Sequence, residues 1–106
     1  MNAINYNNIA FIKVVKKGDF IFRYFPNQDE LYICKNNNEL VIKGIWGKMI
    51  QDVLLNRIDL KKIYKYFLNQ YEFPKERFFD DINKLISILE NNGLILLMND
   101  RDLLRR

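Results

Sequence analysis

The stretch RFFDDINKLISILENNGLI, residues 77–95, predicts an amphipathic helix and the signal that ends it. At about 100° per residue its apolar side chains spread over roughly 180° of the helix surface. A surface helix needs an apolar stripe of only about 100° to pack against a core. Gly93 supplies the left-handed residue that ends the helix after about Asn91. The helix therefore carries more apolar surface than packing against one core explains.

The apolar residues of this helix divide into a central stripe and two flanks. One flank holds Phe79 and Ile86, with Asn83 just beyond them, and Ile88 lies on the other. Our hypothesis is that Phe79, Asn83 and Ile86 line a groove for a second molecule and share Ile82 with the core. The alternative is that both flanks are simply buried against the other helices and the C-terminal segment. The central stripe, which we assign to the core, consists of Phe78, Ile82, Leu85 and Leu89.

Two further helices are expected before this one. In the second, Asp59 is the N-cap of a broad apolar face, and Pro74 ends the helix; that face comprises Leu60, Ile63, Tyr64, Phe67, Leu68 and Tyr71. For the first, an Asn among residues 36–38 is the expected cap, with Glu39 in the first turn. Ile42, Trp46, Met49 and Val53 follow at helical spacing. Gly44 and Gly47 then fall inside that helix, which indicates close packing or a frayed first turn.

The first third of the chain is rich in β-branched and aromatic residues. NIAFIKVVKK (8–17), DFIFRYF (19–25) and LYICK (31–35) predict three strands, with Lys17-Gly18 as a tight hairpin turn between the first two. We therefore predict an α+β fold of the winged-helix kind, in which a three-stranded antiparallel meander is followed by three helices. Residues 1–98 form one domain in this interpretation, and residues 99–106 form a charged C-terminal tail.

Several classes of function lack the residues they need. The chain has no His, a single Cys at position 34 and four glycines that match no phosphate-binding loop, so we expect no catalytic site, metal or cofactor. Asp80 and Asp81 are neighbours on a helix and point about 100° apart, which favours solvated acids over a catalytic pair. The net charge of +4 does not demand nucleic acid. Without a signal peptide or an apolar run of about 18 residues, we expect a soluble cytoplasmic domain without membrane contact.

The second half of the chain resembles the PqqD-like family, the recognition elements for precursors of ribosomally synthesised and post-translationally modified peptides. Ile45-Trp46 is similar to the Ile-Trp of that family's first helix. The second helix is matched by Asp59, Ile63, Phe67 and Tyr71, and the third by Asp81-Ile82, Leu85-Ile86, Leu89 and Gly93-Leu94. The likeness covers roughly residues 30–95. The Leu-Asn that commonly closes the family's third strand has no counterpart in YICKNNNELVIKG, so the end of that strand and the start of the first helix are not fixed.

The resemblance implies a binding function without catalysis. In this family the leader segment of a precursor peptide adds as an extra strand to the edge of the third strand, in a groove beside the third helix. On this chain, the implied docking strand is Leu31, Tyr32, Ile33, Cys34 and Lys35, and the implied groove is lined by Phe79, Ile82, Asn83 and Ile86. Lys35, Lys75 and Arg77 would meet acidic leader residues, unless they are ordinary solvated charges. The implied partners are the precursor peptide and a separate modifying enzyme such as a radical SAM protein, a leader peptidase or a cyclase.

Two other functions remain open at the level of sequence. Three helices and a small sheet also suit a winged-helix DNA-binding transcriptional regulator. A recognition helix should expose Arg, Asn, Gln, Ser or Thr, whereas the third helix offers Asp80, Asp81 and Glu90 with a single Lys84. The other alternative is a generic adaptor domain or a piece of a larger modifying enzyme.

Overall fold

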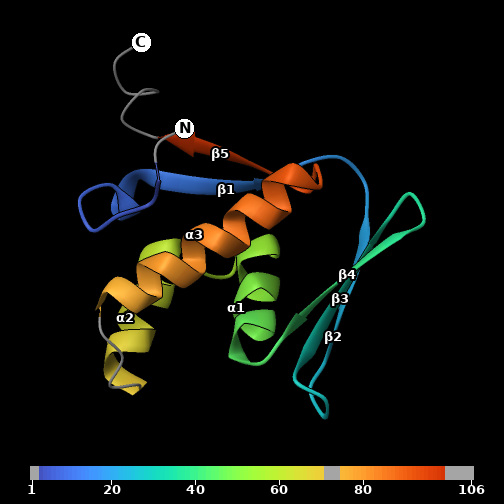
Figure 1. The fold of residues 1–106 in the computed structure, drawn as a ribbon, viewed down its shortest axis with the longest axis horizontal. Helices are drawn as coiled ribbons and strands as arrows, with labels where there is room; N and C mark the ends of the chain where they lie inside the picture. The colour runs from blue at the N-terminus through green and yellow to red at the C-terminus, as the bar shows by residue number, and fades with distance from the viewer. Residues whose placement is uncertain (1–2, 71–74, 100–106) are drawn as a thin grey trace. The chain divides into compact units, whose positions relative to one another are not determined.

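The computed structural model describes residues 3–70 and 75–99 (Figure 1). The chain is α+β, with strands before and after three helices. It divides into two compact units. The central unit comprises Gly18–Ile58, and the terminal unit comprises the residues up to Lys17 together with those from Asp59 onward. Within the described residues, no helix is both long and apolar enough to cross a membrane.

The central unit is a three-stranded antiparallel sheet with one helix. Its strands are β2 (Ile21–Phe25), β3 (Glu30–Lys35) and β4 (Asn38–Lys43), in the order β2-β3-β4, and its helix is α1 (Ile45–Leu54). α1 contacts all three strands. Leu31, Ile33 and Ile42 of the sheet are buried, as are Met49 and Ile50 of the helix. One face of the sheet and one side of α1 therefore form the core of this unit.

The run of three asparagines forms a turn instead of a helix cap. Lys35 pairs with Asn38, so Asn36 and Asn37 form a two-residue loop, with φ of 51° and 67°. A type I′ hairpin turn needs positive φ at both central positions, and Asn tolerates that conformation better than most residues. The predicted start of the first helix is therefore wrong, because residues 38–43 form β4 and α1 begins at Ile45.

Gly44 and Gly47 have separate roles at the start of α1. Gly44 precedes the helix with φ 75°, a conformation that L-residues rarely adopt. Gly47 lies in the first turn, where an added Cβ would approach the Ile42 carbonyl oxygen to 2.7 Å. Of the two predicted explanations, the structure supports close packing at Gly47.

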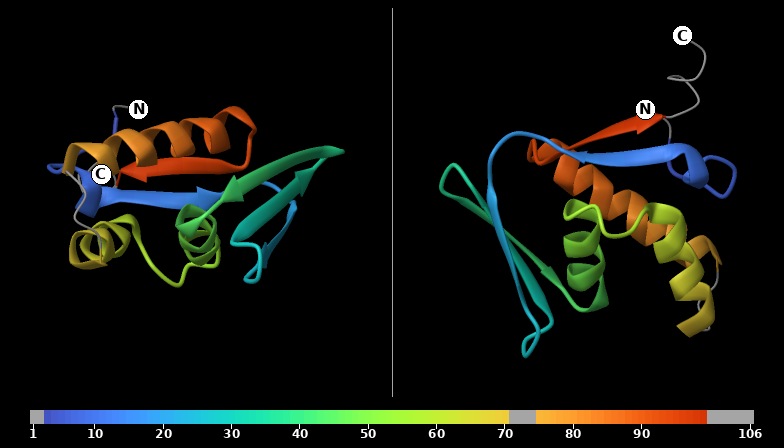
Figure 2. Two further views of the ribbon diagram at one scale, coloured as in Figure 1. Left: turned by 60° about the horizontal axis from the view of Figure 1, so that its bottom comes forward. Right: turned by 180° about the vertical axis from the view of Figure 1, so that it is seen from behind.

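The terminal unit joins both ends of the chain. It contains the 3-10 turn η1 (Ile9–Phe11), β1 (Ile12–Lys16), α2 (Leu60–Gln70), α3 (Lys75–Asn91) and β5 (Ile95–Asn99). β1 and β5 pair antiparallel, from Ile12 opposite Asn99 to Lys16 opposite Ile95, and lie side by side in Figure 2. The predicted hairpin of β1 with β2 is therefore wrong. A three-stranded antiparallel sheet exists as predicted, but its third strand is β4, which pairs with β3, and β1 is not part of it.

The predicted start of α2 and the predicted end of α3 are confirmed. The Asp59 carboxylate accepts a hydrogen bond from the Lys62 amide at 2.8 Å, as an N-cap does. At the end of α3, Gly93 has φ 68°, and the Leu94 amide donates to the Leu89 carbonyl at 3.0 Å in the pattern of a Schellman cap. Tyr71 and Pro74, and the predicted tail beyond Asn99, lie outside the described residues.

Candidate functional site

The predicted docking strand is the central strand of its sheet. β3 pairs with β2 on one side and β4 on the other, so that Ile33 faces both Phe22 and Leu40. Its backbone groups are used by these two ladders, and the side chains of Leu31 and Ile33 are buried. The prediction that Leu31, Tyr32, Ile33, Cys34 and Lys35 receive an added strand is therefore wrong.

Like β2 on the opposite side of the sheet, β4 is an edge strand. Among the described residues it pairs with β3 alone. The pair Lys35–Asn38 closes a two-residue turn and so is a hydrogen-bonded pair. Because such pairs alternate along an antiparallel ladder, Leu40 and Ile42 also bond to β3. The same alternation continues at Gly44, whose amide donates to the Asp29 carbonyl at 2.7 Å.

The backbone groups that point away from β3 consequently belong to Glu39, Val41 and Lys43. Their side chains lie on the sheet face opposite to buried Leu31, Ile33 and Ile42, because successive side chains alternate between faces. We call this the open face. The β4 edge thus presents an acid, an apolar residue and a base, in that order along the strand.

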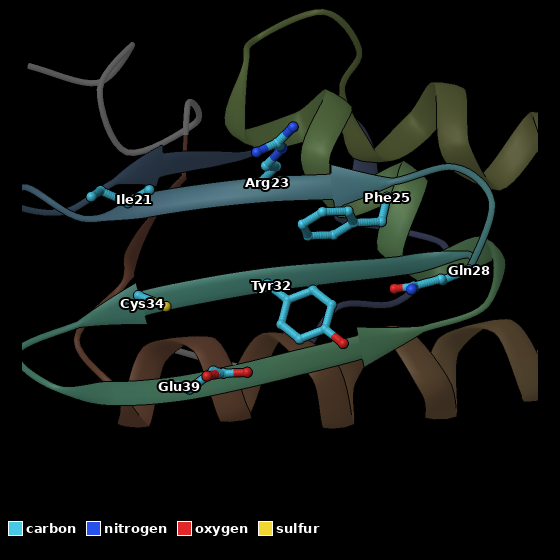
Figure 3. Close-up of a pocket in the computed structure, with 7 residues that line it drawn as sticks. All are labelled: Ile21, Arg23, Phe25, Gln28, Tyr32, Cys34 and Glu39. Atoms are coloured by element: carbon cyan, nitrogen blue, oxygen red, sulfur yellow. The ribbon is translucent and has the colours of Figure 1, made fainter.

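The open face carries a shallow hollow of about 470 Å³ (Figure 3). Its aromatic part is ordered by ring contacts: Phe25 and Tyr32 meet edge to face with centroids 5.2 Å apart, and the Arg23 guanidinium lies 5.1 Å from the Phe25 centroid. Ile21 lines the hollow and is 76% exposed, which is unusual for a large apolar side chain in a strand. The remaining lining residues are Gln28, Cys34 and Glu39.

Two tyrosine hydroxyls on this sheet donate hydrogen bonds to carboxylates. The Tyr32 hydroxyl donates to a Glu30 carboxylate oxygen at 2.6 Å, and this hydrogen bond is the main reason why the pKa of Tyr32 is raised above its ordinary value. The Tyr24 hydroxyl donates to Asp29 at 2.8 Å, which raises the pKa of Tyr24 in the same way. Both phenols therefore stay protonated and neutral near neutral pH. These contacts orient the rings without creating a nucleophile or a base.

The predicted groove residues of the third helix belong to the terminal unit, whereas Leu31–Lys35 belong to the central unit. Ile82 and Ile86 are 0% and 3% exposed, so both are core residues. Leu85, which we assigned to the core, is only half-buried. The core stripe of α3 is thus rotated towards the predicted groove flank and runs through Phe78, Ile82, Ile86 and Leu89.

Asn83 has a different partner from the one predicted. Its amide oxygen accepts from the Ile4 amide at 2.7 Å, and its amide nitrogen donates to the Ile4 carbonyl at 2.8 Å. Ile4 itself is 2% exposed. Phe79 is half-buried, and its ring lies 5.2 Å from that of Tyr64. Part of the surplus apolar surface of α3 is therefore covered within the protein, at Asn83 by its own N-terminal segment. The alternative that both flanks are buried does not hold for the other flank, where Ile88 is 43% exposed.

The edge of β4 is the candidate site that the sequence did not predict. The signal that could have found it was the pair Asn36-Asn37 between two runs of strand-forming residues, which is a hairpin signature. Among the described residues, no three His, Cys, Asp or Glu side chains are grouped in a way that would hold a metal ion. Comparisons with protein-family models, curated proteins and solved structures found no match for the chain.

Proposed function

We propose that this protein binds the leader region of a ribosomally synthesised precursor peptide, as an extended strand added to β4, and delivers it to a separate maturation enzyme. The observation that carries the proposal is the edge of β4, where the backbone groups of Glu39, Val41 and Lys43 have no strand partner among the described residues. An exposed edge recruits an extended segment because each added residue pair satisfies backbone hydrogen bonds.

The resemblance to PqqD-like proteins also supports β4 as the docking strand, once the strands are assigned as the structure shows them. In that family the docking strand directly precedes the helix with the Ile-Trp pair. Here the strand before Ile45-Trp46 is β4, which is also the third strand of the sheet. The proposal includes the winged-helix-like character of the family, a cytoplasmic location and a role without catalysis. The modifying enzyme would be a radical SAM protein, a leader peptidase or a cyclase.

The test is a proline placed at the outward-facing position of β4. Val41→Pro removes an amide that points away from β3, so the β3–β4 ladder keeps its own hydrogen bonds. We expect this variant to remain folded and to bind a fluorescent peptide with the leader sequence of a candidate precursor at least about tenfold more weakly. Unchanged affinity would refute strand addition at β4.

A second measurement keeps the test decisive if Val41→Pro does not fold. Methylating single backbone nitrogens of the leader peptide removes the hydrogen bonds that its own amides donate to β4 carbonyls, and the protein stays unaltered. We expect methylation at every second position of the peptide to weaken binding, because only every second residue of an added strand forms hydrogen bonds with β4. Uniform tolerance of methylation would contradict the proposal, and tight, strongly salt-dependent binding of duplex DNA would favour a DNA-binding function instead.

A further inference from the structure

The edge of β4 is charged at its two ends and apolar between them. Glu39 and Lys43 lie on the open face on either side of Val41, and all three residues point their backbone groups outwards. Leu40 and Ile42 lie between them on the other face, where Ile42 is buried and Leu40 half-buried. An added strand thus meets acid, apolar and basic positions on one face and two apolar positions on the other.

From this pattern we infer that the protein selects an antiparallel peptide segment that reads acidic, three apolar residues, basic in the N-to-C direction. The inference rests on the proposed strand addition and adds the chemical class and the direction of the ligand. In an antiparallel strand the first residue lies opposite Lys43 and the fifth lies opposite Glu39. Opposite charges at directly facing positions stabilise a strand pair, whereas like charges destabilise it.

The direction follows from the sheet and from the cost of the reverse arrangement. β2, β3 and β4 are all antiparallel to their neighbours, and antiparallel pairs are slightly more stable than parallel ones. A parallel segment of the same composition would place its acidic end near Glu39 and its basic end near Lys43. Such a segment would need the reversed order, with the basic residue first, to obtain the same two charge pairs.

The surroundings of Glu39 fit a basic residue on the ligand. Glu39 is exposed at the margin of the hollow, and its direct neighbour across the β3–β4 ladder is the uncharged Cys34. No ion pair within the described part of the chain includes Glu39. Its carboxylate is therefore available to a Lys or Arg on an added strand. Lys43 faces Glu30, so the acidic end of the ligand meets a lysine that already has an acidic neighbour.

The experiment compares two synthetic peptides of identical composition. The forward peptide contains Glu-Val-Val-Val-Lys and the reversed peptide contains Lys-Val-Val-Val-Glu, each flanked by Ser-Gly and carrying a fluorophore. We expect the forward peptide to bind at least about threefold more tightly, since each cross-strand charge pair changes affinity by about twofold to fivefold. β4 itself has the acidic, three apolar, basic order of the forward peptide, so two copies of the protein could pair through their β4 edges. The titrations therefore use dilute protein, in which this pairing does not compete with the peptide.

A charge reversal at Glu39 identifies the pair directly. Against Glu39→Lys we expect a peptide ending in Glu, Glu-Val-Val-Val-Glu, to bind more tightly than the forward peptide, which inverts the order seen with the unaltered protein. The matched control is Asp19→Lys, which makes the same change in net charge at an exposed residue before β2 and should leave the order unchanged. High salt should reduce the difference in affinity between the two peptides, both for the unaltered protein and for Glu39→Lys.

The outcomes separate this inference from the proposed function. Equal binding of both peptides, tighter binding of the reversed peptide, or an unchanged order in Glu39→Lys would overturn the inference, and so would binding of the leader but of neither peptide. In each of these cases the leader's sensitivity to Val41→Pro would leave strand addition standing. If Val41→Pro changes the affinity of neither leader nor peptide, strand addition itself is wrong.

Discussion

At the scale of single residues, Asn83 holds the N-terminal segment against α3 with the two backbone hydrogen bonds that a neighbouring strand would otherwise form. One side-chain amide binds both backbone groups of Ile4, 79 positions earlier, and also donates to the Phe79 carbonyl at 2.8 Å. Asn83→Ala leaves the partly buried backbone groups of Ile4 without this partner, which should lower the free energy of unfolding by about 1–3 kcal/mol. Urea denaturation followed by circular dichroism measures the change.

Asn92 provides the matched control for this prediction. Its side-chain amide also donates to a carbonyl four residues earlier, that of Ile88 at 2.7 Å, but the contact is exposed and binds no distant segment. We expect Asn92→Ala to change the free energy of unfolding by less than about 0.5 kcal/mol. Equal losses in the two variants would mean that the link to Ile4 contributes nothing beyond the local contact.

Tyr32 gives a prediction about pH. Its pKa is raised above the ordinary value of 10.0, first by the hydrogen bond to Glu30, then by burial and by the charges of Glu30 and Glu39. The raised pKa means that the folded protein holds this proton more tightly than the unfolded chain does. The resulting stabilisation is complete below about pH 10 and is lost as the pH rises through the pKa of the folded state.

Glu30→Gln tests the cause of that shift. The substitution removes the negative charge and weakens the hydrogen bond, so we expect the pKa of Tyr32 to fall towards 10.0. Absorbance titration of tyrosinate, compared with the same titration of Tyr32→Phe, isolates this one phenol. An unchanged or higher pKa in Glu30→Gln would show that Glu30 is not what holds the proton.

At the scale of elements, the start of α2 and the end of α3 could be predicted from the sequence, whereas the two strands β4 and β5 and the start of α1 could not. Asp59 and Gly93 act through hydrogen bonds to residues three to five positions away. A local sequence pattern is therefore enough to place the start of α2 and the end of α3. Residues 38–43 carry apolar side chains that suit a helix or a strand equally well. The Asn36-Asn37 turn decides for the strand, because it returns the chain along β3 before a helix can start.

The contact between α1 and the sheet depends on the missing side chain at Gly47. Gly47→Ala would place a Cβ 2.7 Å from the Ile42 carbonyl oxygen and 3.1 Å from the Leu31 amide nitrogen, both of which are backbone atoms that move only with the sheet. We expect a net loss of about 1–3 kcal/mol in the free energy of unfolding, although alanine favours the helix by about 1 kcal/mol. Thermal unfolding measures the loss.

The comparison variant for Gly47→Ala is Lys48→Ala, one residue further along α1. Lys48 is exposed, and its ion pair with Asp52 at 3.2 Å is a surface pair within one helix. Such pairs contribute about 0.3–0.5 kcal/mol, which the better helix propensity of alanine partly offsets. A Gly47→Ala protein as stable as Lys48→Ala would show that α1 does not approach the sheet as closely as described.

At the scale of the whole molecule, the partner of β1 is what sequence reasoning had wrong, and the reason is physical. The alternation in IKVVK predicts a strand with one buried face, but alternation carries no information about which strand lies beside it. Proximity in the sequence favoured β2, whereas β1 pairs with β5 from the far end of the chain. The same limit applies to the candidate site, since the edge that is left open depends on which strands have already paired.

The pairing of the two ends yields a prediction with a built-in control. Along β5, Leu97 is 9% exposed and faces Val14 of β1, whereas its neighbour Leu96 is 50% exposed. Leu97→Ala should lower the free energy of unfolding by about 2–5 kcal/mol, because it removes buried methyl groups from the core of the terminal unit. Leu96→Ala makes the same chemical change on the other face and should cost less than about 0.5 kcal/mol.

The register itself is tested by combining Leu97→Ala with Val14→Ala. Because these two side chains face each other across the β1–β5 ladder, the double variant should lose less stability than the sum of the single losses, by about 0.5–3 kcal/mol. A shift of one residue would turn Leu97 to the other face and Leu96 into the core. Strict additivity, or a larger loss for Leu96→Ala than for Leu97→Ala, would therefore show that the two ends of the chain pair differently from this register.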